Sequence, residues 1–440
     1  MNILIQAGQL ILSLSILVIL HEFGHFLPAR LFKIRVEKFY LFFDPWFSLF
    51  KLKKGDTEYG IGWLPLGGYV KISGMVDESM DKEQLKLPPQ EWEFRSKPAW
   101  QRLIVMLGGV TVNIVSALII YMMIAFTWGE TSLPLANAKY GIMCDSTALD
   151  IGLMNGDKIL SVGGENVEDF HEVTAILLLD KPHTIEIDRN GEKKTIQVPS
   201  DFVKRVLSKG AKGFISPRGL FAAGDFPEKS GAKLAGIQKG DFLVALNGEK
   251  LLFYDQFGPR LSKLKNQKAT IGLIRAGKYQ ELSVPVDADG KIGIFAVSPM
   301  AMLDIVTTHF GFFESIPKGI SLGTKTLSNY LKQFKIIFTK EGAKQIGGFG
   351  TFAGLFGTTW DWESFWRLTA FISIILAVMN ILPIPALDGG HVMFLLYEMI
   401  TRRKPNQKAM EYAQMAGMVV LLALLLYANG NDIFRHFKHS

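Results

Sequence analysis

The sequence predicts a polytopic α-helical membrane protein of about four transmembrane helices, with two small α/β domains inserted between the second helix and the third. Two observations predict this class: four apolar stretches are long enough to cross a bilayer, and one sequence pattern occurs twice between them. The composition agrees, because 48% of the 440 residues are hydrophobic and the mean hydropathy is positive. These values disfavour a purely soluble enzyme.

The chain divides into eight predicted segments. They are a first transmembrane helix (1–30), a cytoplasmic membrane-associated β loop (31–102), a second transmembrane helix (103–128), the first α/β domain (129–205), the second α/β domain (206–298), amphipathic linker helices (299–360), a third transmembrane segment (361–400), and a fourth transmembrane helix with a tail (401–440).

The first apolar stretch runs from Ile3 to Leu20 and is followed at once by His21-Glu-Phe-Gly-His25. Residues four apart on a helix project from one face, so His21 and His25 can bind one metal ion. Neutral imidazoles suit Zn²⁺, and Glu22 can act as general base toward a water that the metal acidifies. Ionisable groups near an apolar span cost about 2.5 to 3.5 kcal/mol each, which favours a functional motif over a chance match.

The remaining apolar stretches are Leu103 to Trp128, about Leu368 to Leu387, and Tyr412 to Ala428. Short loops rich in Lys and Arg stay in the cytoplasm, and such loops follow the first span, precede the second and join the third to the fourth. Both termini and the segment 129–360 are then expected outside. The net charge of +7 is spread over loops and lacks aromatic platforms, which argues against a nucleic-acid partner.

Six residues of the outside segment recur 84 positions later. Ser146, Ala148, Gly152, Gly156, Asp157 and Gly164 return as Ser230, Ala232, Gly236, Gly240, Asp241 and Gly248. Each copy reads as a glycine-bearing turn, an alternating strand and a tight turn. The pattern resembles PDZ domains, which often add an extended peptide to a sheet edge. Neither copy has an identifiable carboxylate-binding loop, so a peptide reader and a peptide-independent steric filter both remain open.

The linker after the second copy carries apolar residues at helical spacing from Leu327 to Phe338, opposite Lys325, Lys332 and Lys335. This helix is expected either along the membrane surface or packed onto a neighbouring part of the protein. The single cysteine, Cys144, excludes an internal disulfide and a Cys-rich zinc site.

A catalytic zinc usually has three protein ligands, so a third ligand is expected elsewhere in the chain. Asp388 is the candidate, in the segment from Asn380 to Gly390, where two prolines and two glycines interrupt an apolar stretch. Irregular backbone at membrane depth is tolerated only where it is buried in protein or lines a polar cavity. The break could present Asp388 to the metal; a prolyl kink with a capping aspartate is the alternative.

Together these motifs resemble the site-2 proteases (peptidase family M50), and within them the RseP-type intramembrane zinc metalloproteases of bacteria. The resemblance covers nearly the whole chain. It implies a Zn²⁺ ion held by His21, His25 and Asp388, with Glu22 catalytic. It also implies that the stretch from Ile61 to Met75 forms a membrane-associated β element near the substrate. The substrate-binding residues that it implies are Asn380, Pro383, Pro385, Gly67, Gly68 and Tyr69.

The function implied is that of a zinc metalloendopeptidase in regulated intramembrane proteolysis. The expected location is the bacterial inner membrane, with the PDZ-like domains on the periplasmic side. Expected substrates are single-span membrane proteins already trimmed by another protease, such as anti-sigma factors or signal-peptide remnants, and the lipid bilayer is the other partner. A non-proteolytic membrane PDZ scaffold is the alternative, and it would have no use for Glu22 or Asp388. A metal transporter is disfavoured, because it needs neither a general base nor two peptide-binding modules.

Overall fold

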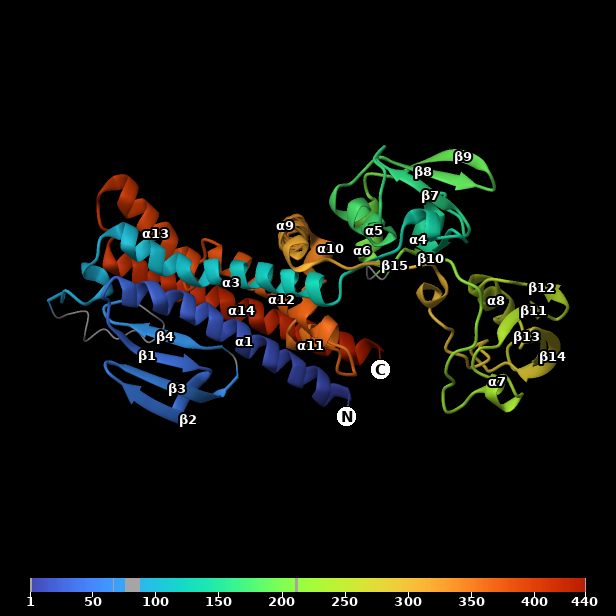
Figure 1. Cartoon of the computed structure of the whole chain (residues 1–440), viewed down its shortest axis with the longest axis horizontal. Coiled ribbons are helices and arrows are strands. Elements are labelled where there is room, and N and C mark those ends of the chain that lie inside the picture. Colours follow the sequence, from blue (N-terminus) through green and yellow to red (C-terminus); the bar gives the residue numbers. More distant parts are fainter. Residues whose placement is uncertain (1, 66, 76–87, 210–212, 440) are drawn as a thin grey trace. The chain divides into compact units, whose positions relative to one another are not determined.

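The computed structural model describes residues 2–65, 67–75, 88–209 and 213–439 (Figure 1). It forms two compact units, unit 1 (Met1–Gly129 with His309–Ser440) and unit 2 (Glu130–Thr308). Among the described residues, four helices are long and apolar enough to cross a membrane. The prediction of a helical membrane protein with inserted domains is confirmed at this level. The four helices are α1 (Asn2–Leu31), α3 (Ala99–Thr127), α12 (Trp362–Ile381) and α14 (Gln407–His439).

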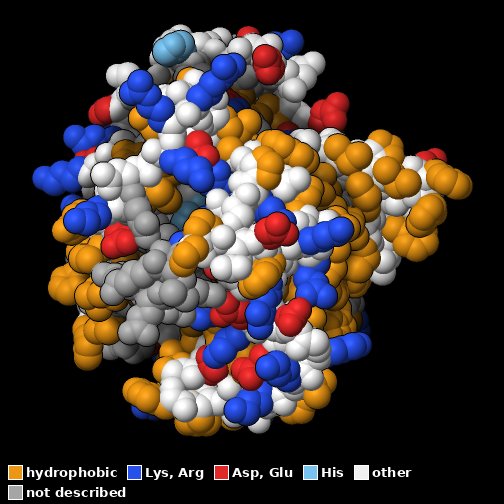
Figure 2. Space-filling view, turned by 90° about the vertical axis from the view of Figure 1, so that its left-hand side faces the viewer, with side chains coloured by type: hydrophobic (Ala, Val, Ile, Leu, Met, Phe, Trp, Pro, Cys, Tyr) orange, Lys and Arg blue, Asp and Glu red, His pale blue; other side chains and the backbone are white. Residues whose placement is uncertain are grey.

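Helix α3 lies at the centre of unit 1, where it contacts α1, α12, α13 (Asp388–Thr401) and α9 (Phe312–Ile337). Figure 1 shows the end of α1, the start of α3 and the turn between α13 and α14 at one end of unit 1, with both chain termini toward the other end. The three basic loops therefore share one end, as the charge pattern predicted. Figure 2 looks onto that end, and Lys and Arg side chains are prominent on it.

The predicted amphipathic helix is α9, and it packs onto α3. A Cβ atom on Gly319 would lie 2.5 Å from the backbone nitrogen of Met122, and one on Gly323 would lie 2.5 Å from the Leu118 side chain. Two glycines one turn apart therefore let the helices approach closely. Of the two expected environments, the structure shows packing onto a neighbouring helix. The short helices α10 (Lys340–Ala343) and α11 (Phe349–Leu355) follow.

The third predicted span is displaced from its expected position of about Leu368 to Leu387. The helix begins earlier, at Trp362, and ends at Ile381. Pro383 and Pro385 lack backbone N–H groups and cannot continue it, so the chain turns irregularly before α13 begins at Asp388. The helix therefore stops short of Leu387, at the proline break that the sequence predicted, and it lies within the predicted third segment, 361–400.

A four-stranded sheet follows α1, in the order β2-β3-β1-β4. Its strands are β1 (Val36–Leu41), β2 (Phe43–Lys54), β3 (Thr57–Leu64) and β4 (Tyr69–Ile72). Strand β1 is parallel to β3 and antiparallel to β4, with Tyr40 opposite Tyr69. Strand β4 is the edge strand next to α1. The expected β element therefore consists of the end of β3, the connection through Gly67 and Gly68, and β4.

Unit 2 contains two copies of one arrangement: a short helix, a strand, a second helix and a β-hairpin. The first copy has α4 (Ser146–Asp150), β7 (Lys158–Val162), α5 (Phe170–Leu179), β8 (Thr184–Arg189) and β9 (Glu192–Gln197). The second has α7 (Gly231–Leu234), β11 (Phe242–Leu246), β12 (Glu249–Lys250), α8 (Tyr254–Leu261), β13 (Lys268–Arg275) and β14 (Lys278–Pro285). Each copy buries its own apolar core. The sequence repeat is therefore also a structural repeat.

Two strand pairs and one helix also belong to unit 2. Strand β5 (Glu130–Ser132) pairs with β15 (Val306–Thr308), and β6 (Ile142–Cys144) pairs with β10 (Ile215–Pro217). Helix α6 (Phe202–Ser208) lies between the copies in sequence. The pairing of β5 with β15 joins the two points where the chain enters and leaves the unit.

Each copy holds one aspartate of the repeated pattern in a buried ion pair. Asp157 accepts a hydrogen bond of 2.7 Å from Arg189 Nε and one of 2.8 Å from the Met154 backbone N–H. In the second copy, Asp241 accepts 2.8 Å bonds from Arg275 Nε and from the backbone N–H of residue 238. In each copy the aspartate therefore links the turn before the first strand (β7 or β11) to an arginine of the β-hairpin.

Candidate metal centre

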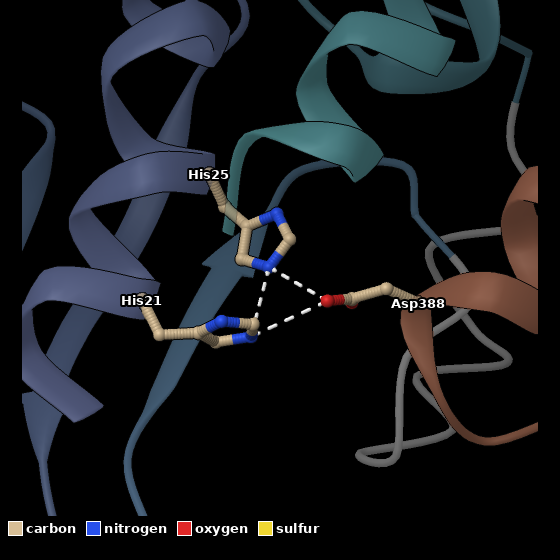
Figure 3. Close-up of side chains that lie close together, drawn as sticks. All are labelled: His21, His25 and Asp388. Carbon is tan, nitrogen blue, oxygen red and sulfur yellow. Dashed lines mark hydrogen bonds and ion pairs between the residues drawn. The ribbon is translucent and has the colours of Figure 1, made fainter. Parts of the chain in front are cut away.

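Helices α1 and α13 bring three candidate metal ligands together (Figure 3). Asp388 Oδ2 lies 3.3 Å from His21 Nε2 and 3.2 Å from His25 Nε2, and the two imidazole nitrogens are 3.3 Å apart. The three ligand atoms all lie within 4.8 Å of one another. Two imidazole nitrogens and one carboxylate oxygen form the donor set of a catalytic zinc site, which leaves a coordination position for water or substrate.

The carboxylate of Asp388 supports the fit of a cation at this position. Its Oδ2 atom is buried and has no hydrogen-bond partner among the described residues. A buried anionic oxygen without a donor is costly unless a cation compensates it. The residues present therefore suit a bound Zn²⁺ ion.

The backbone of α13 explains why Asp388 faces the histidines. The N-cap residue of α13 is Leu387, and Asp388 is the first residue of the helix. The alternative in which Asp388 caps the helix is therefore not observed. Ala386, just before it, has a φ of 85°, a conformation that costs a non-glycine residue about 1 to 3 kcal/mol. A Cβ on Gly390 would lie 2.6 Å from the Cα of Pro385, so the first turn of α13 can fold back only because glycine is there.

Glycines also permit the close crossing of α1 and α3 beneath the histidines. A Cβ on Gly109 would overlap both imidazole rings and lie 2.6 Å from His21 Cε1. Gly24 lies on α1 between the two histidines of the motif. A Cβ on Gly24 would overlap the carbonyl group of Gly108 on α3. Bulkier residues at these positions would push the imidazoles away from α3.

The second nitrogen of each imidazole contacts α3. His25 Nδ1 lies 2.9 Å from the Val105 carbonyl oxygen, and His21 Nδ1 lies 3.1 Å from Asn113 Nδ2. Sequence reasoning missed Gly109, Val105 and Asn113. Two of them had a signal in the sequence: Asn113 is a lone amide inside an apolar helix, and Gly109 belongs to a Gly-Gly pair in the same helix.

Glu22 and Asn380 lie at the same centre. Glu22 is half-buried on α1 between the two histidines, and Asn380 Nδ2, from the last turn of α12, lies 3.3 Å from His21 Nε2. Pro383 is exposed and Pro385 half-buried in the irregular turn that follows Asn380. The structure thus groups the predicted catalytic and metal residues with the predicted substrate segment.

The β element borders Glu22, the predicted general base. A Cβ on Gly68 would lie 2.6 Å from both the Tyr40 carbonyl oxygen and the Val18 side chain, and 3.6 Å from Glu22 Cγ. Tyr69 donates a 2.8 Å hydrogen bond to Asp44 and stacks on the Tyr40 ring. Gly67 has a φ of 151°. The start of β4 is therefore fixed against α1 beside the predicted catalytic residue.

Comparison with known proteins gives a consistent result. The model of "Peptidase family M50" matches residues 9–424, a range that contains all the candidate ligands. The chain is 30% identical to a "Putative zinc metalloprotease" of Vibrio cholerae over 97% of each chain. It is 29% identical to "Putative zinc metalloprotease Cj1068" of Campylobacter jejuni, over 97% of this chain and 92% of that protein. It is 26% identical to the "Regulator of sigma E protease" of Haemophilus influenzae, over 99% of this chain and the whole of that protein.

Proposed function

The chain belongs to peptidase family M50, as its motifs predicted, and we propose that it is an intramembrane zinc metalloendopeptidase of the site-2 protease type. Its reaction is hydrolysis of a peptide bond within the transmembrane segment of a single-span protein. The observation that carries this proposal is the convergence of His21, His25 and Asp388 at the break between α12 and α13, inside a unit whose described residues include four membrane-length helices.

The chemistry divides between the ion and the chain. When bound, Zn²⁺ polarises the scissile carbonyl and acidifies the attacking water. Glu22 takes the proton of that water and passes it to the leaving amine, the two roles of a general acid and base. His21, His25 and Asp388 would hold the ion, and Asn380, whose Nδ2 lies 3.3 Å from His21 Nε2, could bind a substrate group beside it.

A helical substrate must unwind before attack, because its carbonyl groups are engaged in intrahelical hydrogen bonds. The edge strand β4 offers an extended partner for the unwound segment, and its start at Gly68 lies next to Glu22. Pro383 and Pro385 keep the segment between α12 and α13 free of helical structure. These features support the assignment of the predicted substrate-binding residues, which include Gly67 and Tyr69.

The two PDZ-like copies of unit 2 fit a steric filter better than a peptide reader. In the first copy, β6 is bonded on one side to Gly156 and on the other to β10. In the second, the strand at residues 222–225 is bonded on one side to residues 240–241 and on the other to residues 295–297. The chain's own segments thus occupy both edges of each of these inner strands, so neither inner strand has a free edge at which a peptide could be added.

A filter suits substrates whose outer domain has already been removed by another protease. Similarity to the "Regulator of sigma E protease" of Haemophilus influenzae supports an anti-sigma factor as one proposed substrate class. Signal-peptide remnants are the other proposed class. The shared end of the three basic loops supports a cytoplasmic position for that end, with unit 2 on the periplasmic side of the inner membrane. Deletion of residues 129–298 should then allow cleavage of an untrimmed substrate; continued refusal of that substrate would contradict the filter.

The direct test is cleavage of a tagged single-span model substrate by detergent-purified protein. Glu22→Gln should reduce the rate by about 10²- to 10⁴-fold, the usual contribution of general acid–base catalysis, while the protein still retains zinc. A chelator should abolish cleavage, and added zinc should restore it. Equal background in all samples, with a correctly folded protein and an accepted family substrate, would favour the non-proteolytic scaffold instead.

A further inference from the structure

The two imidazoles of the metal centre differ in what holds them. His25 Nδ1 faces the Val105 carbonyl oxygen at 2.9 Å, a hydrogen-bond acceptor supplied by the backbone of α3. His21 Nδ1 faces the side-chain amide of Asn113 at 3.1 Å. Asn113 is fully buried, and its Oδ1 atom has no hydrogen-bond partner in the part of the chain that the structure describes. The histidine pair is therefore asymmetric.

Metal binding imposes one tautomer on both rings. The Nε2 atoms of His21 and His25 point at Asp388 Oδ2, so these are the nitrogens available to an ion (Figure 3). A neutral imidazole that gives its Nε2 lone pair to a metal carries its hydrogen on Nδ1 and donates it to an acceptor. Val105 provides that acceptor for His25. The group that faces Nδ1 of His21 is the side-chain amide of Asn113.

An asparagine amide can meet this requirement by a half-turn of its terminal group, which exchanges the positions of oxygen and nitrogen. In one orientation Nδ2 donates to an unprotonated His21 Nδ1. In the other, Oδ1 accepts from Nδ1–H. In the orientation present, Oδ1 has no hydrogen-bond partner among the described residues, so the hydrogen position on His21 decides which orientation is favoured.

The backbone around Asn113 keeps its amide in place. Ser373 on α12 donates a 2.7 Å hydrogen bond from its hydroxyl to the Asn113 carbonyl oxygen. Gly109, one turn before Asn113, leaves the space that the imidazoles occupy. The amide therefore faces His21 from a helix that is fixed on both sides.

We propose that Asn113 is a positioning residue that sets the tautomer of His21, with its Oδ1 accepting the Nδ1 hydrogen when the ion is bound. The proposal rests on the proposed zinc peptidase function. It assigns to a side chain on α3 the role that the Val105 carbonyl performs for His25. Because one role is performed by a side chain, it can be removed by substitution, whereas the other cannot.

The test measures zinc retention, by metal analysis of purified full-length protein after dialysis against graded concentrations of a chelator. Asn113→Leu removes the acceptor, and we expect zinc affinity to fall by about 10- to 100-fold, the usual effect of losing a residue that orients a ligand. Asn113→Asp keeps an acceptor at the same position and should restore retention to near the wild-type level. Thr369→Val is the matched control, because it removes a buried hydroxyl of α12 that bonds Ser13 and the Phe365 carbonyl rather than Asn113, and it should retain zinc normally.

The measurements distinguish failure of the positioning role of Asn113 from failure of the proposed peptidase function. Asn113→Ala is measured beside Asn113→Leu, since the smaller side chain fits the same space if leucine disturbs folding, and thermal unfolding confirms that each variant is folded. Zinc retention unchanged in the folded Ala or Leu variant overturns the positioning role and leaves the proposed function intact. Equal loss in Asn113→Asp and Asn113→Ala also overturns it. A wild-type protein that binds no zinc contradicts the proposed function itself.

Discussion

The metal centre and the repeats of unit 2 both bury carboxylates beside nitrogen donors, yet the two kinds of site are completed differently. Asp157 and Asp241 each accept hydrogen bonds from an arginine and from the backbone, and so have their partners within the same repeat. Asp388 faces two imidazoles and keeps one buried oxygen without a hydrogen-bond donor among the described residues. A satisfied carboxylate indicates a structural role, whereas an unsatisfied one indicates a place for a ligand.

Substitution of Asp388 gives the strongest test of this contrast. Asp388→Asn should abolish zinc retention and reduce peptide cleavage by at least about 10²-fold, because a carboxylate ligand is lost. Zinc analysis and cleavage assays check the two statements, and thermal unfolding shows that the variant is folded. Full activity in Asp388→Asn would show that a different group completes the site.

The β element gives the next test, because it touches the metal centre without contributing a ligand. Gly68→Ala should displace β4 from α1 and reduce kcat/KM by up to about 10²-fold, the effect of a misplacement of about 1 Å near a reacting group. Zinc retention should not change. Gly8→Ala is the matched control, because a Cβ on Gly8 meets no atom within 4 Å. Loss of zinc in Gly68→Ala would instead place this segment in the metal site.

The repeats should respond to substitution through stability. Asp241→Asn should lower the free energy of unfolding of unit 2 by about 2 kcal/mol, since hydrogen bonds to charged groups contribute about 1.5 to 3 kcal/mol. Zinc retention should be normal. The control is Asp225→Asn, which breaks an exposed pair with Lys239 and should have little effect. A comparable loss in both variants would argue against the special role of the buried pair.

The same pair predicts a pH dependence. The hydrogen bond from Arg275 lowers the pKa of Asp241 below its ordinary value. Its contribution to stability is then present above the unfolded pKa of about 3.9 and is lost as the pH falls through the folded value. Unfolding of wild type and Asp241→Asn, followed from pH 6 downward, should show a smaller acid-induced loss in the variant. Parallel curves would contradict this linkage.

The smallest expected effect concerns Cys144. Burial raises the pKa of its thiol to about 12, so almost no thiolate is present at pH 8. Native protein should react slowly with iodoacetamide, and denatured protein quickly, as mass spectrometry of the alkylated chain would show. Cys144→Ser should leave cleavage unchanged. Rapid alkylation of the native protein would show that this strand opens readily.

Much of the fold followed from local patterns. The length of the apolar stretches predicted four helices, and the recurring glycines and aspartates predicted the repeat that unit 2 contains. The third apolar stretch continues to Leu387 although the helix ends at Ile381, because Pro383 and Pro385 stop a helix without ending the run of apolar residues. The arginines that complete the repeated pairs were missed, since Arg189 and Arg275 lie outside the segment in which the pattern is recognisable.

The sequence by itself determined the features that depend on near neighbours: the spacing of His21 and His25 on one helix face, the apolar lengths, the duplicated pattern and the proline break before Asp388. Only the tertiary structure decided which groups meet across the chain. It placed Asn113 and Gly109 beneath the imidazoles, brought Gly68 beside Glu22 and packed α9 onto α3. The physical reason is that helical periodicity is set by local backbone geometry, whereas these contacts depend on how closely small residues allow distant helices and strands to approach.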